Sequence, residues 1–497
     1  MVTTYDALTA DGFISYDLLW LYIKPGQLLV HKHPTYARMQ AMRVTRTRYV
    51  VPSGDEPAYF QVNADVIEYS GTRMFRYGVK RAIVAFSGPM ELEELPLIPL
   101  ARLPKSARAE LVARGRRFEE LAGVQYVDYQ GPMYVRENCR IMALAANSRI
   151  MVDRANFGKF NPGYPMAQPS NQSMSYQGMD EADTTPMWLQ EKDFTDEDYL
   201  LMPPIVYGFC LSKKIWGEFL VDVVKPIQFV SNAFDLLVLP EATKDLVMGL
   251  VSSHQRHSLV GDMIRGKGNG LVFLLHGAPG IGKTLTAEAI AETLHKPLYS
   301  VGVGELGCTP SELEHNLQRA LDLAEAWNCV LLLDEADVFM EQRSAHEVER
   351  NGLVSIFLRL LEYTSSILFL TSNRVQSLDA AFHSRISLAL RYPNLDFDAR
   401  KTVWNQVLDR IEEKDGDKAR RWRKHIDVNE LAKVPLNGRR IKGVLRTAHA
   451  MAVNKGVDLT MDQIRSVLKI SDDFHQHLKG KAVNGGLEAD DDGELDM

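Results

Sequence analysis

The sequence predicts an α/β fold in which a parallel β-sheet covered by helices is followed by an all-α region and preceded by a mixed α+β domain. From about residue 258 onward, apolar runs of strand length alternate with helical stretches, as parallel sheets buried on both faces require. Nearer the N-terminus, short β-type runs separated by turn residues are typical of an antiparallel sheet. At 497 residues the chain is long enough for two or three domains that each bury a core.

The composition excludes several classes of protein. The net charge is −7 and charged residues make up 24%, so no strong field favours nucleic acid. No apolar run approaches the roughly 20 residues that a transmembrane helix needs, and the N-terminal stretch lacks the basic cluster of a signal or transit peptide. The cysteines, Cys139, Cys210, Cys308 and Cys329, have no metal-ligand spacing. This predicts reduced thiols and an intracellular, reducing compartment, either cytoplasm or nucleus.

Residues 1–195 are predicted to form the N-terminal α+β domain. Between Met42 and Phe86, β-type runs are divided by turn signals such as Ser53-Gly54-Asp55. An amphipathic pattern predicts a helix over 105–121, and β structure is expected to resume over 124–154.

Two further stretches carry weaker patterns. Residues 160–187 are rich in Pro, Gly, Ser, Asn and Gln and lack apolar spacing, which predicts a mobile loop. Residues 196–244 are predicted to be a short β-rich connector to the next domain.

The nucleotide-binding α/β domain is predicted over 245–393. Its strands are expected at 271–275, 298–301, 330–333, 367–370 and 386–390. After Pro393 the sequence becomes helical and charged, which predicts a helical lid over 394–475. Residues 476–497 end in an acidic run and are expected to be disordered.

The main functional motif lies in the stretch Leu271–Thr284, LVFLLHGAPGIGKT. An apolar strand leads into a sequence that fits G-x-x-x-x-G-K-T, the phosphate-binding loop. Glycines allow successive N–H groups to surround a phosphate, and the following helix adds its positive end. We expect Lys283 to reach the β and γ phosphates and the Thr284 hydroxyl to hold Mg²⁺. The predicted binding set is Gly277, Ala278, Pro279, Gly280, Ile281, Gly282, Lys283, Thr284 and Leu285.

A pair of carboxylates follows a second buried strand, in the run CVLLLDEAD. The strand delivers Asp334 and Glu335 at its carboxyl end, where ligands bind in open α/β sheets. Asp334 is predicted to hold Mg²⁺, directly or through water, and Glu335 to orient and deprotonate the attacking water. Phosphoryl transfer depends on this positioning and charge stabilisation.

Two more polar residues complete the predicted site. In ILFLTSNR a strand delivers Thr371 and Asn373, and an amide at this place can hydrogen-bond the attacking water or the γ-phosphate. Arg385 lies in LDAAFHSRISLAL, before the next strand. Its own nucleotide would be distant, so Arg385 is predicted to act on the γ-phosphate of a neighbouring subunit.

Taken in order, GAPGIGKT, LLLDEAD and TSN followed by a helical region resemble an AAA+ ATPase over roughly residues 245–470. The segments YSVGVGELG, RNGLVSIFLRLLEY and AFHSRISLALRYP resemble the filamentous-fungal AAA proteins with an uncharacterised N-terminal domain before the ATPase core. In the N-terminal part, YDLLWLYIKPG and RGRRFEELAGVQY are similar to that group more loosely.

The resemblance implies roles for further positions. It makes Asn373 the first sensor and Arg385 the arginine finger, and it places the stretch from Asp262 to Gly266 near the adenine. A second sensor arginine is implied at the start of a lid helix, in LNGRRIKGVL. Arg439 and Arg440 are both candidates, and Arg440 is preferred because many AAA+ lids have Gly-x-Arg at that turn.

One segment departs from the family pattern. AAA+ translocases thread their substrate with an aromatic-apolar-glycine loop after the second strand. The corresponding segment here, Gly304–Pro310, is short and has no aromatic residue. This argues against threading of a peptide through a central pore and leaves ATP hydrolysis unaffected.

These observations predict an ATPase that uses ATP and Mg²⁺ at the interface between subunits of a homo-oligomeric ring, with a hexamer favoured. The expected work is remodelling of a macromolecular partner, a protein rather than a nucleic acid. The main alternative is a nucleotide-gated assembly scaffold with slow or incidental hydrolysis. A nucleic-acid motor is disfavoured by the acidic composition, and GTP is disfavoured because no N-K-x-D guanine motif occurs in the later strands.

Overall fold

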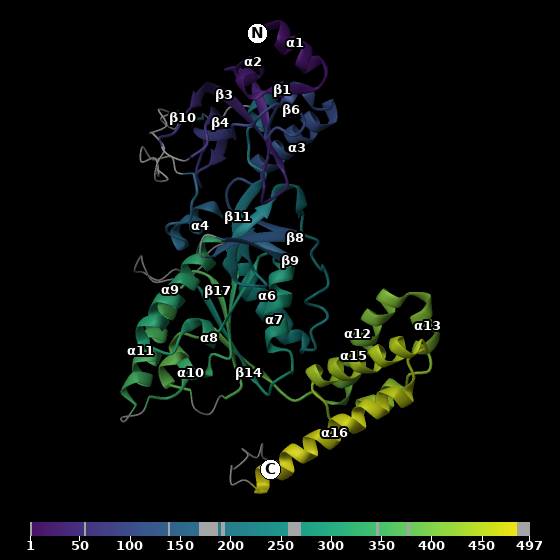
Figure 1. Cartoon of the computed structure of the whole chain (residues 1–497). Helices are drawn as coiled ribbons and strands as arrows, with labels where there is room; N and C mark the ends of the chain where they lie inside the picture. Colours follow the sequence, from purple (N-terminus) through teal and green to yellow (C-terminus); the bar gives the residue numbers. More distant parts are fainter. Residues whose placement is uncertain are drawn as a thin grey trace. The chain divides into compact units, whose positions relative to one another are not determined.

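The computed structural model describes residues 2–53, 56–137, 140–167, 187–189, 194–256, 270–343, 347–374 and 378–484. The chain divides into two compact units, Met1–Gln228 and Phe229–Met497. Figure 1 shows their secondary structure, coloured from purple at the N-terminus to yellow at the C-terminus. In the described part of the chain, no helix is both long enough and apolar enough to cross a membrane.

The second unit contains a five-stranded sheet in the order β15-β16-β17-β14-β18, in which every pair of neighbours is parallel. The strands are β14 (Leu271–Gly277), β15 (Leu298–Gly302), β16 (Val330–Asp334), β17 (Ile367–Ser372) and β18 (Leu388–Tyr392). The predicted parallel sheet is therefore confirmed. Because β17 lies between β14 and β16, the carboxyl ends of these three strands are neighbours at one edge of the sheet.

Helices cover both faces of this sheet, with α9, α10 and α11 on one side and α6 and α7 on the other (Figure 1). They are α6 (Glu241–Arg256), α7 (Lys283–Thr293), α8 (Val303–Leu306), α9 (Pro310–Ala326), α10 (Asp337–Met340) and α11 (Val348–Glu362). Local sequence sets the start of α9, where the Thr309 hydroxyl accepts a hydrogen bond from the Glu312 N–H and the Glu312 carboxylate accepts one from the Thr309 N–H. This capping box satisfies two N–H groups that the helix itself leaves unpaired.

The C-terminal part of the second unit is all-α, as predicted, but its last helix continues to Asn484 and so enters the stretch 476–497 that was expected to be disordered. Its helices are α12 (Phe397–Asp415), α13 (Asp417–Arg423), α14 (Val428–Ala432), α15 (Gly438–Lys455) and α16 (Met461–Asn484). They bury a core of their own around Trp404, Ile441 and Leu445, each fully buried. Such a core allows this helical region to hold together as a separate lid.

The first unit is a mixed α+β unit with antiparallel sheets, as predicted. One sheet has six strands in the order β10-β5-β4-β3-β2-β7: β2 (Leu28–Lys32), β3 (Met39–Val50), β4 (Tyr59–Tyr69), β5 (Met74–Val84), β7 (Leu97–Pro99) and β10 (Met187–Trp188). A smaller pair joins β1 (Phe13–Ser15) and β6 (Pro89–Glu91). The helices of this unit are α1 (Val2–Ala10), α2 (Leu19–Tyr22), α3 (Lys105–Glu120), α4 (Arg154–Phe160) and α5 (Asp196–Leu200).

A second antiparallel sheet of this unit changes the prediction for residues 196–244. Instead of forming a separate connector, part of that stretch supplies β11 (Ile205–Cys210), β12 (Ile215–Leu220) and β13 (Val224–Lys225) to a sheet with β8 (Gln125–Glu137) and β9 (Arg140–Val152). Strand β12 pairs with both β11 and β8, so four of the strands form a closed ring. The sequence missed this because strand pairing over such separations leaves no local signal.

Candidate functional site

From the end of β14 to the start of α7, the backbone favours glycine at three positions, Gly277, Gly280 and Gly282. Gly277 has a φ of +144° and Gly282 a φ of +110°, values that residues with a side chain rarely adopt. At Gly277, a Cβ atom would also lie 2.3 Å from the carbonyl oxygen of Tyr392. Helix α7 then begins at Lys283, so the unpaired N–H groups of its first turn adjoin the loop. This combination is the usual geometry of a phosphate-binding site.

The Lys283 side chain is buried against this loop. Its Nζ donates hydrogen bonds to the carbonyl oxygens of Gly277 at 2.5 Å and Ala278 at 2.9 Å, and to Oδ1 of Asn373 at 2.8 Å. Burial lowers the pKa of Lys283, while nearby carboxylates, Asp337 foremost, act to raise it. A charged ammonium is thus held where β14, β17 and α7 meet.

Asp334 at the end of β16 lies beside two hydroxyl groups. Its Oδ1 accepts hydrogen bonds from Thr284 Oγ1 at 3.3 Å and from Thr371 Oγ1 at 2.5 Å. Thr284 belongs to the second position of α7 and Thr371 to β17, so three elements converge on one carboxylate. A carboxylate beside a threonine hydroxyl is the set of oxygen ligands that Mg²⁺ takes in nucleotide sites, where phosphates and water complete its coordination.

Glu335 has an unusual backbone and an exposed side chain. Its φ is +57°, in the left-handed region that non-glycine residues seldom occupy. Its backbone N–H donates to Thr371 Oγ1 at 2.8 Å. The next residue, Ala336, donates its N–H to the Thr371 carbonyl oxygen at 3.0 Å. The turn after β16 is therefore tied to β17, and it leaves the Glu335 carboxylate exposed beside the phosphate-binding loop.

Asn373 lies on the loop directly after β17. Its backbone N–H donates to both carboxylate oxygens of Asp337, at 3.1 and 3.3 Å. Its side-chain Oδ1 accepts the hydrogen bond from Lys283. A chain of contacts thus runs from Asp337 through Asn373 to Lys283, and it brings the amide group to the phosphate-binding loop.

The two candidate arginines of the lid lie in different surroundings. The Arg439 backbone N–H donates to the Gly280 carbonyl oxygen at 3.2 Å, and the charge of Arg439 lowers the pKa of Lys283. The Arg440 guanidinium instead bonds to Asp472 Oδ1 at 2.8 Å on α16. These contacts favour Arg439 over Arg440 by position, and which of the two senses the nucleotide stays a prediction. Consecutive residues of a helix point about 100° apart, and it is Arg439 that lies at the loop.

Arg385 follows a 3₁₀ turn over Ala380–Ser384 and is held by contacts within its own subunit. Its guanidinium donates to the carbonyl oxygens of Leu358 at 3.1 Å and Ala381 at 3.0 Å, and it pairs with Glu362 at 3.3 Å. These partners belong to α11 and to the preceding turn, none of them to the phosphate-binding loop.

Comparison with known families agrees with this geometry. Residues 273–394 match the model of the ATPase family associated with various cellular activities, AAA. Residues 395–484 match the fungal AAA+ ATPase lid domain, and residues 4–104 match a domain of unknown function, DUF7025. The chain therefore contains an AAA ATPase domain followed by a fungal AAA+ ATPase lid domain.

Individual relatives match parts of the chain. The uncharacterized AAA family ATPase y4kL of Sinorhizobium fredii is 31% identical over 182 residues, which are 35% of this chain and 53% of that protein. The human ATPase family gene 2 protein homolog B is 35% identical over 117 residues, 22% of this chain and 15% of that protein. The CD-NTase-associated protein 6 of Pseudomonas aeruginosa is 26% identical over 277 residues, 49% and 89% of the two chains. The chain thus spans about half or less of the first two relatives.

The structure places the other predicted site residues in different surroundings. Asp262 and Gly266 lie outside the described residues. Ile281 packs into the apolar core beneath the loop, whereas Leu285 is 45% exposed on α7. The Pro279 carbonyl oxygen accepts a hydrogen bond from Asn437 Nδ2 at 3.1 Å, a second link between the loop and the lid.

Three residues of the candidate site were not assigned a role from the sequence. The sequence offered a signal for Asp337, because this third carboxylate lies only three positions after Asp334 in LLLDEAD. It is also the first residue of α10. Thr371 had a weaker one as a polar residue at the end of a buried strand. No sequence signal pointed to Tyr392, because its partner is far away in the chain. Its hydroxyl lies 2.7 Å from the hydroxyl of Thr286, near the start of α7.

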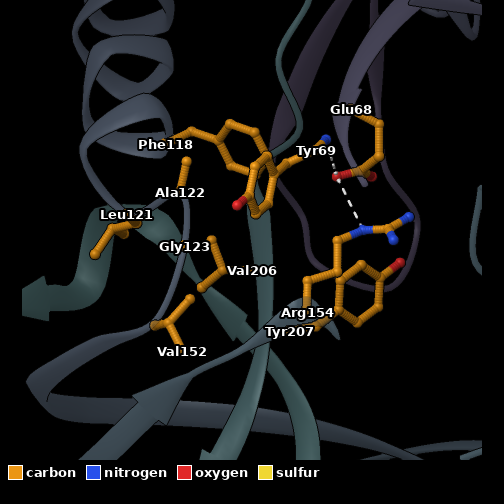
Figure 2. Close-up of a pocket in the computed structure, with 10 residues that line it drawn as sticks. All are labelled: Glu68, Tyr69, Phe118, Leu121, Ala122, Gly123, Val152, Arg154, Val206 and Tyr207. Atoms are coloured by element: carbon orange, nitrogen blue, oxygen red, sulfur yellow. Dashed lines mark hydrogen bonds and ion pairs between the residues drawn. The ribbon is translucent and has the colours of Figure 1, made fainter. Parts of the chain in front are cut away.

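A small pocket lies in the first unit and is drawn in Figure 2. Arg154 Nε and Glu68 Oε1 are 3.9 Å apart on one side of a pocket, and apolar side chains including Phe118 and Leu121 line the other. Burial raises the pKa of Glu68 to about 7, against the opposing effect of Arg154. The pocket volume of about 10 Å³ is close to that of one water molecule, so it has no room for a nucleotide or a peptide.

Proposed function

We propose that this chain binds ATP with Mg²⁺ and hydrolyses it, and that turnover in a homo-oligomeric ring drives remodelling of a macromolecular partner. The observation that carries the proposal is the convergence of Lys283, Asn373 and the Asp334–Glu335 pair at the carboxyl edge of one parallel sheet. Three separate strands bring these groups together beside a glycine loop and a helix start. Such preorganised charges and dipoles account for most of the catalysis of phosphoryl transfer.

Each side chain has a role that its position supports. Lys283 exchanges its carbonyl partners for the β and γ phosphate oxygens and neutralises their charge. Glu335, exposed at the end of the sheet, accepts the proton of the attacking water. The amide of Asn373 orients that water or the γ-phosphate. Because the backbones that carry these groups meet at the carboxyl ends of neighbouring strands, the groups are already close together before nucleotide binds.

The oxygen atoms of Thr284 and Asp334 fit a magnesium ion. The hydroxyl of Thr284 donates to the Asp334 carboxylate, which leaves its lone pairs for a cation. When bound, Mg²⁺ supplies charge neutralisation to the phosphate oxygens. The chain's own part is to hold these two oxygen ligands beside Lys283.

The position of Arg385 and the match to the AAA ATPase domain support the proposed ring. The contacts of Arg385 lie on α11 and on the preceding turn, and not at its own phosphate-binding loop, as suits a finger that serves a neighbour's nucleotide. We favour a hexamer and a protein partner bound through the N-terminal unit. The segment Gly304–Pro310 offers no aromatic residue for peptide threading, so lid and ring motions are the proposed means of coupling.

A lid variant tests which arginine senses the nucleotide. Arg439→Ala is expected to weaken ATP binding about tenfold, a loss of roughly 1.4 kcal/mol, because Arg439 lies at the loop and its charge reaches Lys283. Arg440→Ala is the matched control and is expected to bind ATP normally, since its guanidinium pairs with Asp472. Titration with a fluorescent ATP analogue measures both, and a selective defect in Arg440→Ala would contradict the assignment.

Turnover by the purified full chain tests the proposed function directly. Phosphate release is expected when both ATP and Mg²⁺ are present. It is expected to fall to background when EDTA removes the metal, and to be slower when GTP replaces ATP at equal concentration. The physical reason is that the Thr284 and Asp334 oxygens require a cation to engage the phosphates. A preference for GTP would contradict the nucleotide assignment. Tight ATP binding without measurable phosphate release would favour the assembly scaffold instead.

A further inference from the structure

Thr371 is bonded to three consecutive residues of the hydrolytic turn. It lies at the end of β17 with 1% of its surface exposed. Its hydroxyl accepts the Glu335 N–H at 2.8 Å and donates to Asp334 Oδ1 at 2.5 Å. Its carbonyl oxygen accepts the Ala336 N–H at 3.0 Å. One buried side chain therefore lies between the predicted metal ligand and the predicted general base.

The backbone of Glu335 needs such support. The left-handed region is sterically strained for a non-glycine residue, and Glu335 has a φ of +57°. Strained backbone of this kind persists only where surrounding contacts define it. The hydrogen bond to the Thr371 hydroxyl fixes the peptide plane before Glu335, and with it the direction in which the carboxylate leaves the turn.

The hydroxyl of Thr371 also orients Asp334. A threonine hydroxyl has one proton and two acceptor lone pairs. The proton goes to Asp334 and one lone pair receives the Glu335 N–H, so both contacts are made at once. Thr284 donates to the same carboxylate oxygen at 3.3 Å. Two hydroxyls from different elements thus donate to the same oxygen, Oδ1, of the Asp334 carboxylate.

We propose that Thr371 is a positioning residue for ATP hydrolysis, which sets Glu335 and Asp334 relative to each other through its hydroxyl. The inference rests on the proposed function. Thr371 acts through its two neighbours and not by contact with the nucleotide. The adjacent Ser372 has a different task, because its hydroxyl bonds only to the backbone of Arg374 among the described residues.

Two substitutions separate the hydroxyl from the shape of the side chain. Thr371→Val keeps the branched shape and removes the hydroxyl, whereas Thr371→Ser keeps the hydroxyl. Thr364→Val is a matched control, because Thr364 is 4% exposed in the same unit and its hydroxyl has no hydrogen-bond partner in the described structure. Thermal unfolding of all three variants checks that the unit remains folded.

The expected kinetic result is specific for positioning. Thr371→Val is expected to lower kcat for ATP roughly 10²-fold, the typical cost of misplacing a catalytic group by about 1 Å, with ATP affinity within about twofold of wild type. The Mg²⁺ concentration for half-maximal activity is expected to rise, since Asp334 loses a donor. Thr371→Ser and Thr364→Val are expected to keep kcat within about threefold. Equal loss in Thr371→Ser and Thr371→Val, or full activity in Thr371→Val, overturns the proposal.

A structural measurement decides the inference independently of turnover. Crystal structures of the wild type and Thr371→Val are expected to show that Glu335 leaves the left-handed region only in the variant. If Glu335 keeps a positive φ without the hydroxyl, Thr371 does not position it. A wild-type chain that fails to hydrolyse ATP contradicts the proposed function alone, while the backbone of Glu335 in the two structures still tests the role of Thr371.

Discussion

Replacing Glu335 by Gln is expected to slow ATP hydrolysis by roughly 10²–10⁴-fold, the usual contribution of a general base. The amide cannot accept the proton of the attacking water, and it has nearly the same shape as the carboxylate. Nucleotide affinity is expected to persist, because the hydrogen bonds of the Lys283 ammonium go to Gly277, Ala278 and Asn373 and not to the Glu335 carboxylate. Single-turnover phosphate release and titration with a fluorescent ATP analogue measure the two effects.

The matched control for this variant is Glu325→Gln. Glu325 is exposed near the end of α9, close to the start of β16 and thus at the opposite edge of the sheet from Glu335. Its replacement is expected to leave hydrolysis unchanged. Equal activity of Glu335→Gln and wild type would show that the base is another residue.

The same variant separates the remodelling enzyme from the scaffold. If ATP turnover drives the work, Glu335→Gln is expected to hold its partner in the ATP state, and crosslinking in cells followed by identification of the bound protein reveals what that partner is. Release of the partner at the wild-type rate would favour the scaffold, in which nucleotide binding alone orders the assembly.

Replacing Arg385 by Ala is expected to lower kcat by roughly 10³-fold or more, the effect of losing an arginine finger. Affinity for ATP is expected to change little, because the guanidinium bonds to Leu358, Ala381 and Glu362 and not to its own phosphate-binding loop. Steady-state phosphate release at saturating ATP measures the loss. Analytical sedimentation of the Glu335→Gln variant with ATP bound measures the number of subunits in the assembly, and six are expected.

Mixed assemblies test whether Arg385 acts between subunits. Subunits with Arg385→Ala keep an intact loop, and subunits with Lys283→Ala keep an intact finger. Each alone is expected to be inactive, whereas mixing them is expected to restore part of the activity, because some interfaces then pair a good loop with a good finger. Absence of recovery in confirmed mixed rings, or a monomer with ATP bound, would sink the trans assignment.

Much of the fold could be predicted because the signals are local. The apolar runs of the second unit predict its strands, and all five occur in the sheet with ends shifted by a few residues. The phosphate-binding loop is equally local, since its glycines, Lys283 and Thr284 are contiguous. It was also predictable that Asp334 and Asn373 lie at the same side of the sheet, because neighbouring parallel strands place their carboxyl ends together.

The sequence by itself therefore determined the α/β class, the all-α lid, the antiparallel N-terminal sheets and the residue types available for phosphate chemistry. Only the tertiary structure decided that residues 205–225 complete the sheet of the first unit, that Arg439 rather than Arg440 lies at the loop, and that Thr371 bonds to both members of the Asp334–Glu335 pair. Periodicity reports which residues are buried within one element. The three features that the structure decided depend on how elements pack against one another, which no local pattern encodes. They are the face of the lid helix that meets the loop, the pairing of strands far apart in sequence, and the hydrogen-bond partners of one hydroxyl.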